Sequence, residues 1–133
     1  MNIRELRAGN IVIYEACYFM VLDINTSQKP FLVVKPVNHD WENDKCGINE
    51  VEGVPIDDNI LRKNGFVPLN NIAPNTLWIK ELGGNRFIRY NSRVQYMEFE
   101  ETVSFQRVPW AVRFLHQMQN ACTDYGLELE FKP

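Results

Sequence analysis

Near its C-terminus the chain reads Val108-Pro-Trp-Ala-Val-Arg-Phe-Leu-His-Gln-Met-Gln-Asn-Ala-Cys-Thr-Asp-Tyr-Gly126 and continues as Leu127-Glu-Leu-Glu-Phe131. The apolar residues of the first stretch recur at helical spacing, which predicts one amphipathic helix packed on a core. Pro109 fits the first turn of this helix, and Gly126 fits its end. After Gly126 the apolar and acidic residues alternate, which predicts a half-buried final strand.

Composition places the chain among ordinary globular domains. It has 133 residues, of which 45% are hydrophobic and 23% are charged. The formal net charge of −3 argues against a chain devoted to non-specific nucleic-acid binding, because such chains carry a basic surplus. The chain begins with charged and polar residues, and its apolar runs are far shorter than the ~20 residues of a membrane span. We therefore expect a cytoplasmic protein without a membrane segment.

The first 55 residues contain several short strand-like runs. Strands are expected over residues 11–14, 17–24 and 31–34, with a tight turn at Glu15-Ala16 and a polar loop over residues 38–49. One or two further short strands are expected around Gly53. Short strands at this spacing predict a small antiparallel barrel or meander. The opening Leu6-Arg-Ala-Gly-Asn-Ile-Val12 resembles the start of an SH3-like barrel.

The middle of the chain predicts a short helix and then a meander. Asp57 or Asp58 is a suitable helix N-cap, and Gly65 is a suitable stop. Two strand-like runs then flank Gly83-Gly84, a strong hairpin signal because glycine adopts positive φ readily. Further strands are expected over residues 93–99 and 102–108.

Arg86, Arg89 and Arg93 are interleaved with Tyr90 and Tyr96, and no acidic residue interrupts this stretch. On a sheet, the Arg side chains could hold phosphates while the rings stack on exposed bases, so these five residues are a candidate nucleic-acid site. Strand alternation, however, places Arg86 and Arg89 on opposite faces. An amphipathic hairpin whose Arg stems cover apolar surface explains the same pattern.

The remaining polar residues form no catalytic or metal-binding signature. Glu98 and Glu100 project from one face of a strand, which is also typical of a solvated strand end. His116 falls on the polar side of the helix and shows no sequence-local partner to make it a general base. Asp40 opens an acidic loop, but Lys45 stands where a calcium loop requires Gly. We predict no catalytic, cofactor-binding or metal-ligating residue and no cofactor.

Three stretches together resemble a family of short uncharacterised proteins encoded by gut anaerobic bacteria and by their prophages and other mobile elements. They are Leu6-Arg-Ala-Gly-Asn-Ile-Val-Ile-Tyr14, Gly53-Val-Pro-Ile-Asp-Asp-Asn-Ile-Leu-Arg-Lys-Asn-Gly-Phe66, and Phe114-Leu-His-Gln-Met-Gln-Asn120 with Gly126-Leu-Glu-Leu-Glu130. The resemblance implies no reaction and no site, because the family has none assigned. It implies a setting, that of an accessory protein of a phage or mobile element.

The sequence therefore predicts an α+β fold. A small SH3-like antiparallel β-barrel is expected over residues 1–55. A short helix, a β-meander packed by a C-terminal α-helix, and a final strand are expected over residues 56–133, either as a second domain or sharing one core with the first part.

For function we expect a non-enzymatic protein-binding or assembly module whose partner is another protein. Nucleic-acid binding by the Arg86–Tyr96 region is the alternative, and an enzyme of unidentified class is the third hypothesis. An exposed apolar patch with scattered Arg residues would favour a protein partner, and a surface cluster of the three Arg would favour nucleic acid. A deep pocket around His116 or around the pair Glu98 and Glu100 would favour an enzyme.

Overall fold

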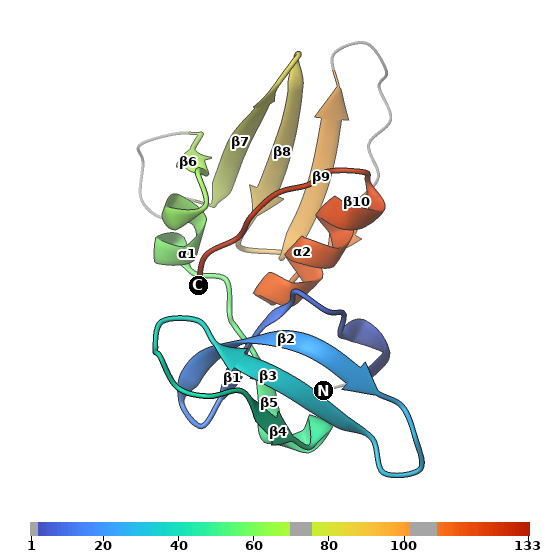
Figure 1. Ribbon diagram of the computed structural model, residues 1–133. Helices are drawn as coiled ribbons and strands as arrows, with labels where there is room; N and C mark the ends of the chain where they lie inside the picture. The colour runs from blue at the N-terminus through green and yellow to red at the C-terminus, as the bar shows by residue number, and fades with distance from the viewer. Residues whose placement is uncertain (1–2, 70–75, 102–108) are drawn as a thin grey trace. The chain divides into compact units, whose positions relative to one another are not determined.

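The computed structural model describes residues 3–69, 76–101 and 109–133 (Figure 1). Within these ranges the fold is α+β, with two antiparallel sheets of five strands each and one main helix, α2 (Leu115–Asp124). Contacts group the chain into two compact units: residues 1–55, 114–129 and 133 form one, and residues 56–113 and 130–132 form the other. The sequence analysis placed the C-terminal helix with residues 56–133, whereas its contacts group it with the first sheet.

The first sheet has the strand order β4-β3-β2-β1-β5. The predicted tight turn joins β1 to β2, and both of its residues, Glu15 and Ala16, adopt positive φ. The expected polar loop over residues 38–49 contains one strand and most of a 3-10 turn that were not predicted, because elements of three residues show no periodicity. The elements are η1 (Ile3–Glu5), β1 (Ile11–Tyr14), β2 (Cys17–Asn25), β3 (Phe31–Pro36), β4 (Asp44–Cys46), η2 (Ile48–Glu50) and β5 (Val51–Gly53).

One face of the first sheet supplies a hydrophobic core. The bulge of β2 between Val21 and Asp23 bends this long strand. The described strands form an open sheet with β4 and β5 at its edges, so the closed barrel expected from the sequence is not found among them. The buried core residues are Leu6, Val12, Tyr14, Phe19, Val21, Leu32, Val34, Cys46 and Val51.

The second sheet has the strand order β10-β9-β8-β7-β6, and its central strands form the predicted meander. The hairpin between β7 and β8 is confirmed, although Gly83 still pairs in β7 and the turn is made by Gly84 and Asn85, both with positive φ. The predicted strand over residues 102–108 lies outside the described residues. The elements are α1 (Asp58–Lys63), β6 (Val67–Pro68), β7 (Leu77–Gly83), β8 (Arg86–Asn91), β9 (Tyr96–Glu101) and β10 (Pro109–Ala111).

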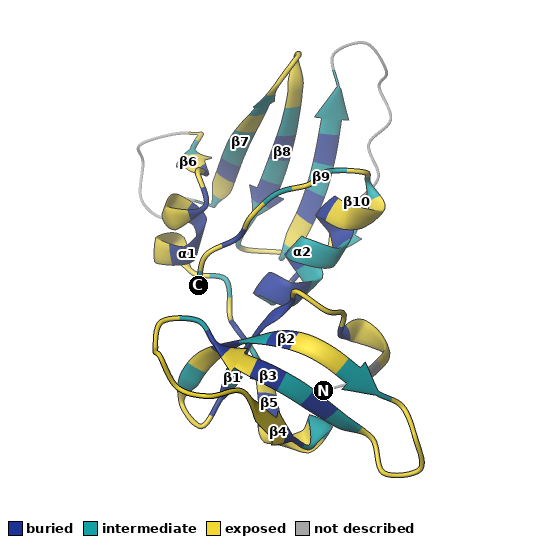
Figure 2. Cartoon of the chain, viewed as in Figure 1, coloured by how far each residue is buried: buried dark blue, intermediate teal, exposed yellow. Residues whose placement is uncertain are grey.

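Alternate residues of the meander are buried, and they appear as dark blue bands along β7, β8 and β9 in Figure 2. Because successive side chains of a strand point to opposite faces, these residues make one packed face of the sheet. Each is at most 1% exposed: Trp78, Ile88, Tyr90, Met97 and Phe99.

Helix α1 confirms the predicted start and stop signals. The Asp57 carboxylate accepts a hydrogen bond from the Ile60 amide at 2.8 Å, as an N-cap does. Gly65 follows the helix with φ of 83°, a conformation that favours glycine. The prediction held because both signals act within one turn of the helix.

Helix α2 begins later than predicted. It starts at Leu115, while Pro109–Ala111 forms β10 and pairs with β9. The Phe114 amide, just before the helix, donates to the Gln117 side chain at 3.1 Å, which caps the helix. Helical periodicity extended the prediction to Pro109 because it cannot report a pairing partner elsewhere in the chain. No helix in the described ranges is long and apolar enough to span a membrane.

The predicted final strand does not form, since residues 127–133, all of them described, carry no strand. The predicted alternation is present, with Leu127, Leu129 and Phe131 more buried than the Glu residues between them. The main chain of Lys132 pairs with the side chain of Asn64 and not with a strand. The Lys132 amide donates to Asn64 Oδ1 at 2.7 Å, and Asn64 Nδ2 donates to the Lys132 carbonyl at 2.8 Å.

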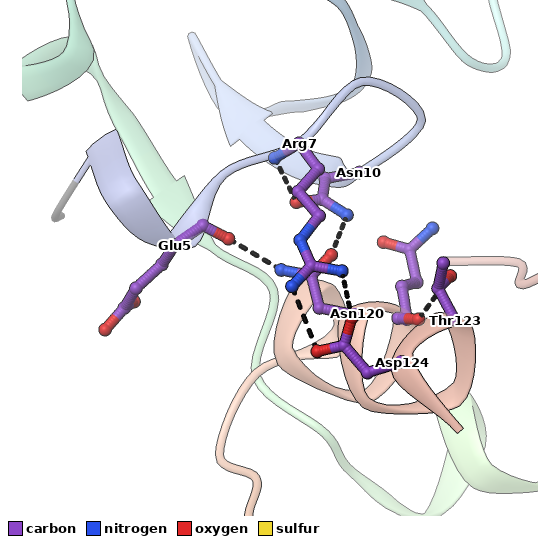
Figure 3. A network of polar contacts seen from close by, with 7 residues as sticks. Glu5, Arg7, Asn10, Asn120, Thr123 and Asp124 are labelled. Atoms are coloured by element: carbon purple, nitrogen blue, oxygen red, sulfur yellow. Dashed lines mark hydrogen bonds and ion pairs between the residues drawn. The ribbon is translucent and has the colours of Figure 1, made fainter. Parts of the chain in front are cut away.

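A polar network ties α2 to the segment before β1 (Figure 3). Asn10 is only 3% exposed, and its side-chain amide nitrogen donates to the side-chain oxygen of Asn120 at 2.8 Å. Asn120 in turn donates to the main-chain oxygen of Glu5. The two nitrogens of the Arg7 guanidinium contact the Asp124 carboxylate at 2.7 Å and 3.0 Å, and this pair holds the pKa of Asp124 below its usual value.

Candidate functional site

The second sheet has a face that the packed core does not use. Its side chains come from the alternate positions of β7, β8 and β9, together with neighbouring residues in β6, just after β6 and in the β8–β9 turn. We call this the open face. Its members are Val67, Leu69, Leu77, Ile79, Glu81, Phe87, Arg89, Asn91, Val94, Tyr96, Glu98 and Glu100.

The pairing register fixes which side chains are neighbours on the open face. Directly opposed residues in antiparallel strands lie on the same side and within contact distance. Three rows cross β7, β8 and β9 on this face: Leu77, Asn91 and Tyr96; then Ile79, Arg89 and Glu98; then Glu81, Phe87 and Glu100.

Large apolar side chains gather on the open face. Eight such side chains are exposed among the described residues, and five of them are here. Singly exposed apolar residues are normal, but a contiguous group is typical of an interaction site. The five are Val67 (57% exposed), Leu69 (50%), Leu77 (40%), Val94 (53%) and Tyr96 (49%).

Three adjoining hollows mark the open face. The largest, about 460 Å³, lies around Leu77, Val94 and Tyr96. A second of about 310 Å³ lies around Val67, Ile79 and Phe87. A small one of about 30 Å³ is lined by Leu77 and by Ile79, so it connects the other two. The two larger hollows are large enough to accept whole apolar side chains of a partner.

The charged groups of the open face are mostly acidic. Arg89 forms an ion pair with Glu100, at 3.0 Å between Nε and Oε2. Arg89 is also in register with Glu98, and Glu81 lies in the second hollow. With three carboxylates and one guanidinium among its members, the open face has an acidic balance.

The five residues of the predicted nucleic-acid site do not share a surface. Arg86 is exposed and points to the opposite face of β8 from Arg89. Arg93 is exposed in the β8–β9 turn. Tyr90 is 1% exposed and donates its hydroxyl to the Val112 carbonyl at 3.0 Å. Burial raises the pKa of Tyr90 to about 12. The structure therefore brings together Arg89 and Tyr96, and it places the ring of Tyr90 in the core.

Glu98 and Glu100 project from one face, as the sequence predicted, and Arg89 lies beside them. The prediction for His116 was wrong. Its side chain is fully buried in the first unit, with Nε2 at 3.5 Å from Oε2 of Glu5. That distance is too long for an ordinary hydrogen bond, and neither ring nitrogen has a hydrogen-bond partner. Sequence periodicity gave no signal of this burial, because the residues around His116 come from η1 and β5.

Buried His116 predicts a pH-dependent stability. Burial lowers its pKa below the ordinary 6.5, and the Glu5 carboxylate opposes the shift. Below about pH 6.5 the unfolded chain therefore binds a proton more readily than the folded protein. The free energy of unfolding, measured by urea denaturation, should fall as the pH is lowered from about 6.5. His116→Gln should flatten this dependence, whereas His39→Gln at an exposed position should leave it; equal slopes in both variants would contradict the prediction.

The described side chains include no group of three His, Cys, Asp or Glu residues arranged to hold a metal ion. The acidic loop around Asp40 instead carries a stacked pair of rings, His39 and Trp41, with centroids 4.0 Å apart. Comparison of the chain with protein-family models, with curated proteins and with solved structures found no match.

Proposed function

We propose that this chain is a protein-binding module that takes an apolar, basic segment of a partner protein on the open face. The observation that carries this proposal is the gathering of five of the eight exposed large apolar side chains around adjoining hollows. Apolar anchors seated in such hollows supply most of the affinity of protein interfaces. A partner segment with two or three large apolar side chains on one side matches this surface.

The charges favour a basic partner. The carboxylates of Glu81, Glu98 and Glu100 lie in the rows next to Leu77 and Tyr96, while the one guanidinium of the open face is ion-paired. Lys or Arg residues flanking the partner's apolar side chains would meet these carboxylates, which speeds association and selects the partner. A second copy of the open face would bring like charges together, so a different protein is the better match.

The same charges disfavour nucleic acid on this surface. Phosphate binding needs cations that can replace the counterions of the backbone. Arg89 is opposite Glu98 and ion-paired with Glu100, and Tyr90 is too buried to stack on a base. An acidic surface with one paired guanidinium repels a polyanion.

We also propose that the first sheet belongs to the SH3-like type. The support is its topology: five antiparallel strands in the order β5-β1-β2-β3-β4, a bulged second strand, and a 3-10 turn just before the last strand. The resemblance to short proteins of gut anaerobes is our ground for proposing an accessory role in a phage or mobile element. Both proposals concern type and setting, and neither assigns a reaction.

The binding proposal is tested with two synthetic amphipathic helical peptides. Both carry Leu on one side, and they carry either Lys or Glu at the polar positions. In amide chemical-shift titrations, the Lys peptide should perturb the strands of the open face, and its affinity should fall with added salt. Leu77→Ser should weaken this binding by about tenfold or more, since it removes about 1.4 kcal/mol or more of apolar contact.

Leu22→Ser is the matched control. Leu22 lies on β2 of the first sheet and is 39% exposed, against 40% for Leu77. The proposal fails if the Lys peptide binds both variants equally, or if its perturbations lie outside the second sheet. Binding of the Glu peptide with equal affinity would show that the carboxylates of the open face play no part.

A further inference from the structure

The largest hollow of the open face combines apolar walls with charge. Leu77, Val94 and the ring of Tyr96 supply apolar surface, and each of these side chains is at least 40% exposed. Among the described residues that line this hollow, only Glu98 and Arg89 are charged. A partner side chain that enters the hollow of about 460 Å³ therefore meets apolar surface together with one carboxylate and one guanidinium.

The guanidinium in this hollow is already paired, whereas the carboxylate is not. Arg89 forms its ion pair with Glu100, at 3.0 Å between Nε and Oε2. The carboxylate of Glu98 makes no hydrogen bond or ion pair with any residue that the structure describes. Glu98, Glu100 and Arg89 together hold two carboxylates and one guanidinium, so one negative charge is in excess. A cation is the group that balances this cluster.

The second hollow, of about 310 Å³, has a different charge balance. Its described walls are mostly apolar, and Glu81 supplies their one carboxylate. Gly65 also lines this hollow, and a Cβ placed on Gly65 would lie 3.3 Å from Nζ of Lys80. A cation of the chain itself therefore lies beside the second hollow, and a partner cation would meet repulsion there. The second hollow suits an uncharged apolar side chain.

A lysine side chain matches the largest hollow in both of its parts. Its four-carbon stem lies readily along apolar surface while its ammonium group stays charged. Here the stem would pack on Leu77 and Val94, and the ammonium would donate to the Glu98 carboxylate. The exposed ring of Tyr96 also attracts a cation to its face. A leucine in the same place would desolvate the Glu98 carboxylate without pairing it, which costs affinity.

We propose that the largest hollow is the subsite for a lysine side chain of the partner, selected by the Glu98 carboxylate, and that the second hollow takes an uncharged apolar side chain. This inference rests on the function proposed above, and it assigns the basic and the apolar parts of the partner segment to separate hollows. Glu98 is then a specificity-determining residue, and Glu81 is not.

The test compares two forms of one peptide, the amphipathic helix with Leu on one side and Lys at the polar positions. In the second form the lysines are acetylated, which removes the ammonium charge. Glu98→Gln should weaken binding of the Lys peptide about threefold to tenfold, the range for one partly desolvated ion pair. The same variant should leave the affinity for the acetylated peptide unchanged. In the complex with the Lys peptide, nuclear Overhauser effects should join the Lys ε-methylene protons to the Tyr96 ring.

Glu81→Gln is the matched control. It removes the same charge from the same face with the same change of side-chain shape, and it should leave the affinity for the Lys peptide nearly unchanged. If the Lys peptide binds the open face but both variants weaken it equally, the proposed function stands and the lysine subsite is overturned. The subsite is also overturned if Glu98→Gln weakens both peptides equally, since Glu98 would then act through the shape of the surface. If neither peptide perturbs the strands of the open face, the proposed function itself fails, and the subsite fails with it.

Discussion

Gly53→Ala is expected to destabilise the first unit by about 1 to 3 kcal/mol, the usual cost of inserting a methyl group into a filled space. A Cβ at this position would lie 2.6 Å from Cγ and 2.7 Å from Cδ1 of Phe114. Those distances are well inside van der Waals contact, and the ring is held in place by packing on His116. Backbone geometry is not the obstacle, because Gly53 is paired in β5 with Val12. The free energy of unfolding from urea denaturation, followed by circular dichroism, measures the effect.

Gly47→Ala is the control for Gly53→Ala. A Cβ on Gly47 would meet only the Glu50 carboxylate, at 3.4 Å, which is ordinary contact. Phe114→Leu in the Gly53→Ala background should recover part of the loss, since a smaller side chain relieves the clash. A Gly53→Ala cost no larger than that of Gly47→Ala, or a double variant with strictly additive losses, would show that Phe114 does not limit this position.

Signals that act over a few residues could be predicted from the sequence. The Asp57 cap, the Gly65 stop and the Glu15-Ala16 turn all concern hydrogen bonds or φ angles within one turn of chain. The alternating burial along the strands of the meander could also be predicted, because apolar and polar residues alternate in the sequence there. This is why the α+β class and the meander of the second sheet could be predicted from the residues alone, whereas the closed barrel predicted for the first part was not found.

Features that depend on distant partners could not be predicted. Pro109–Ala111 forms a strand by pairing with β9, and in the tail the main-chain groups of Lys132 pair with the Asn64 side chain and not with a strand. His116 is buried by residues of η1 and β5, which lie more than 60 positions earlier in the chain. For the same reason, the open face needed the register of three strands before Leu77 and Tyr96 could be recognised as neighbours.

The function hypotheses also depended on contacts between residues that are distant in the sequence. The sequence could name Arg86, Arg89 and Arg93 as a cluster in the chain, but only the pairing of β8 shows that Arg89 faces Glu98 and Glu100. A charge cluster in sequence becomes a binding surface only if the strands present it on one side. The exposed apolar side chains of the open face show the reverse case. They come from three separate segments of the sequence and form one group only in the folded chain.

Asn64→Ala is expected to release the C-terminal tail and to cost about 1 to 3 kcal/mol, since it leaves buried hydrogen-bonding groups without partners. Asn64 is 5% exposed, and its side chain accepts from the Lys132 amide and donates to the Lys132 carbonyl. It also donates to the carbonyl of Ile60 in α1, at 2.8 Å. One side chain therefore closes a loop of chain between residues 64 and 132. Amide hydrogen exchange at Lys132, together with the free energy of unfolding, reports the change.

The graded variant Asn64→Asp separates the two halves of this contact. The carboxylate keeps an acceptor for the Lys132 amide but loses both donors, so Lys132 exchange should rise less than in Asn64→Ala while the unfolding free energy still falls. Asn59→Ala, at an exposed position of the same helix α1, should change neither measurement. If Lys132 exchanges as slowly in Asn64→Ala as in Asn59→Ala, the tail is held by the burial of Phe131 and not by Asn64. The exchange rate then decides between apolar packing and a side-chain hydrogen bond as the force that replaces the missing strand.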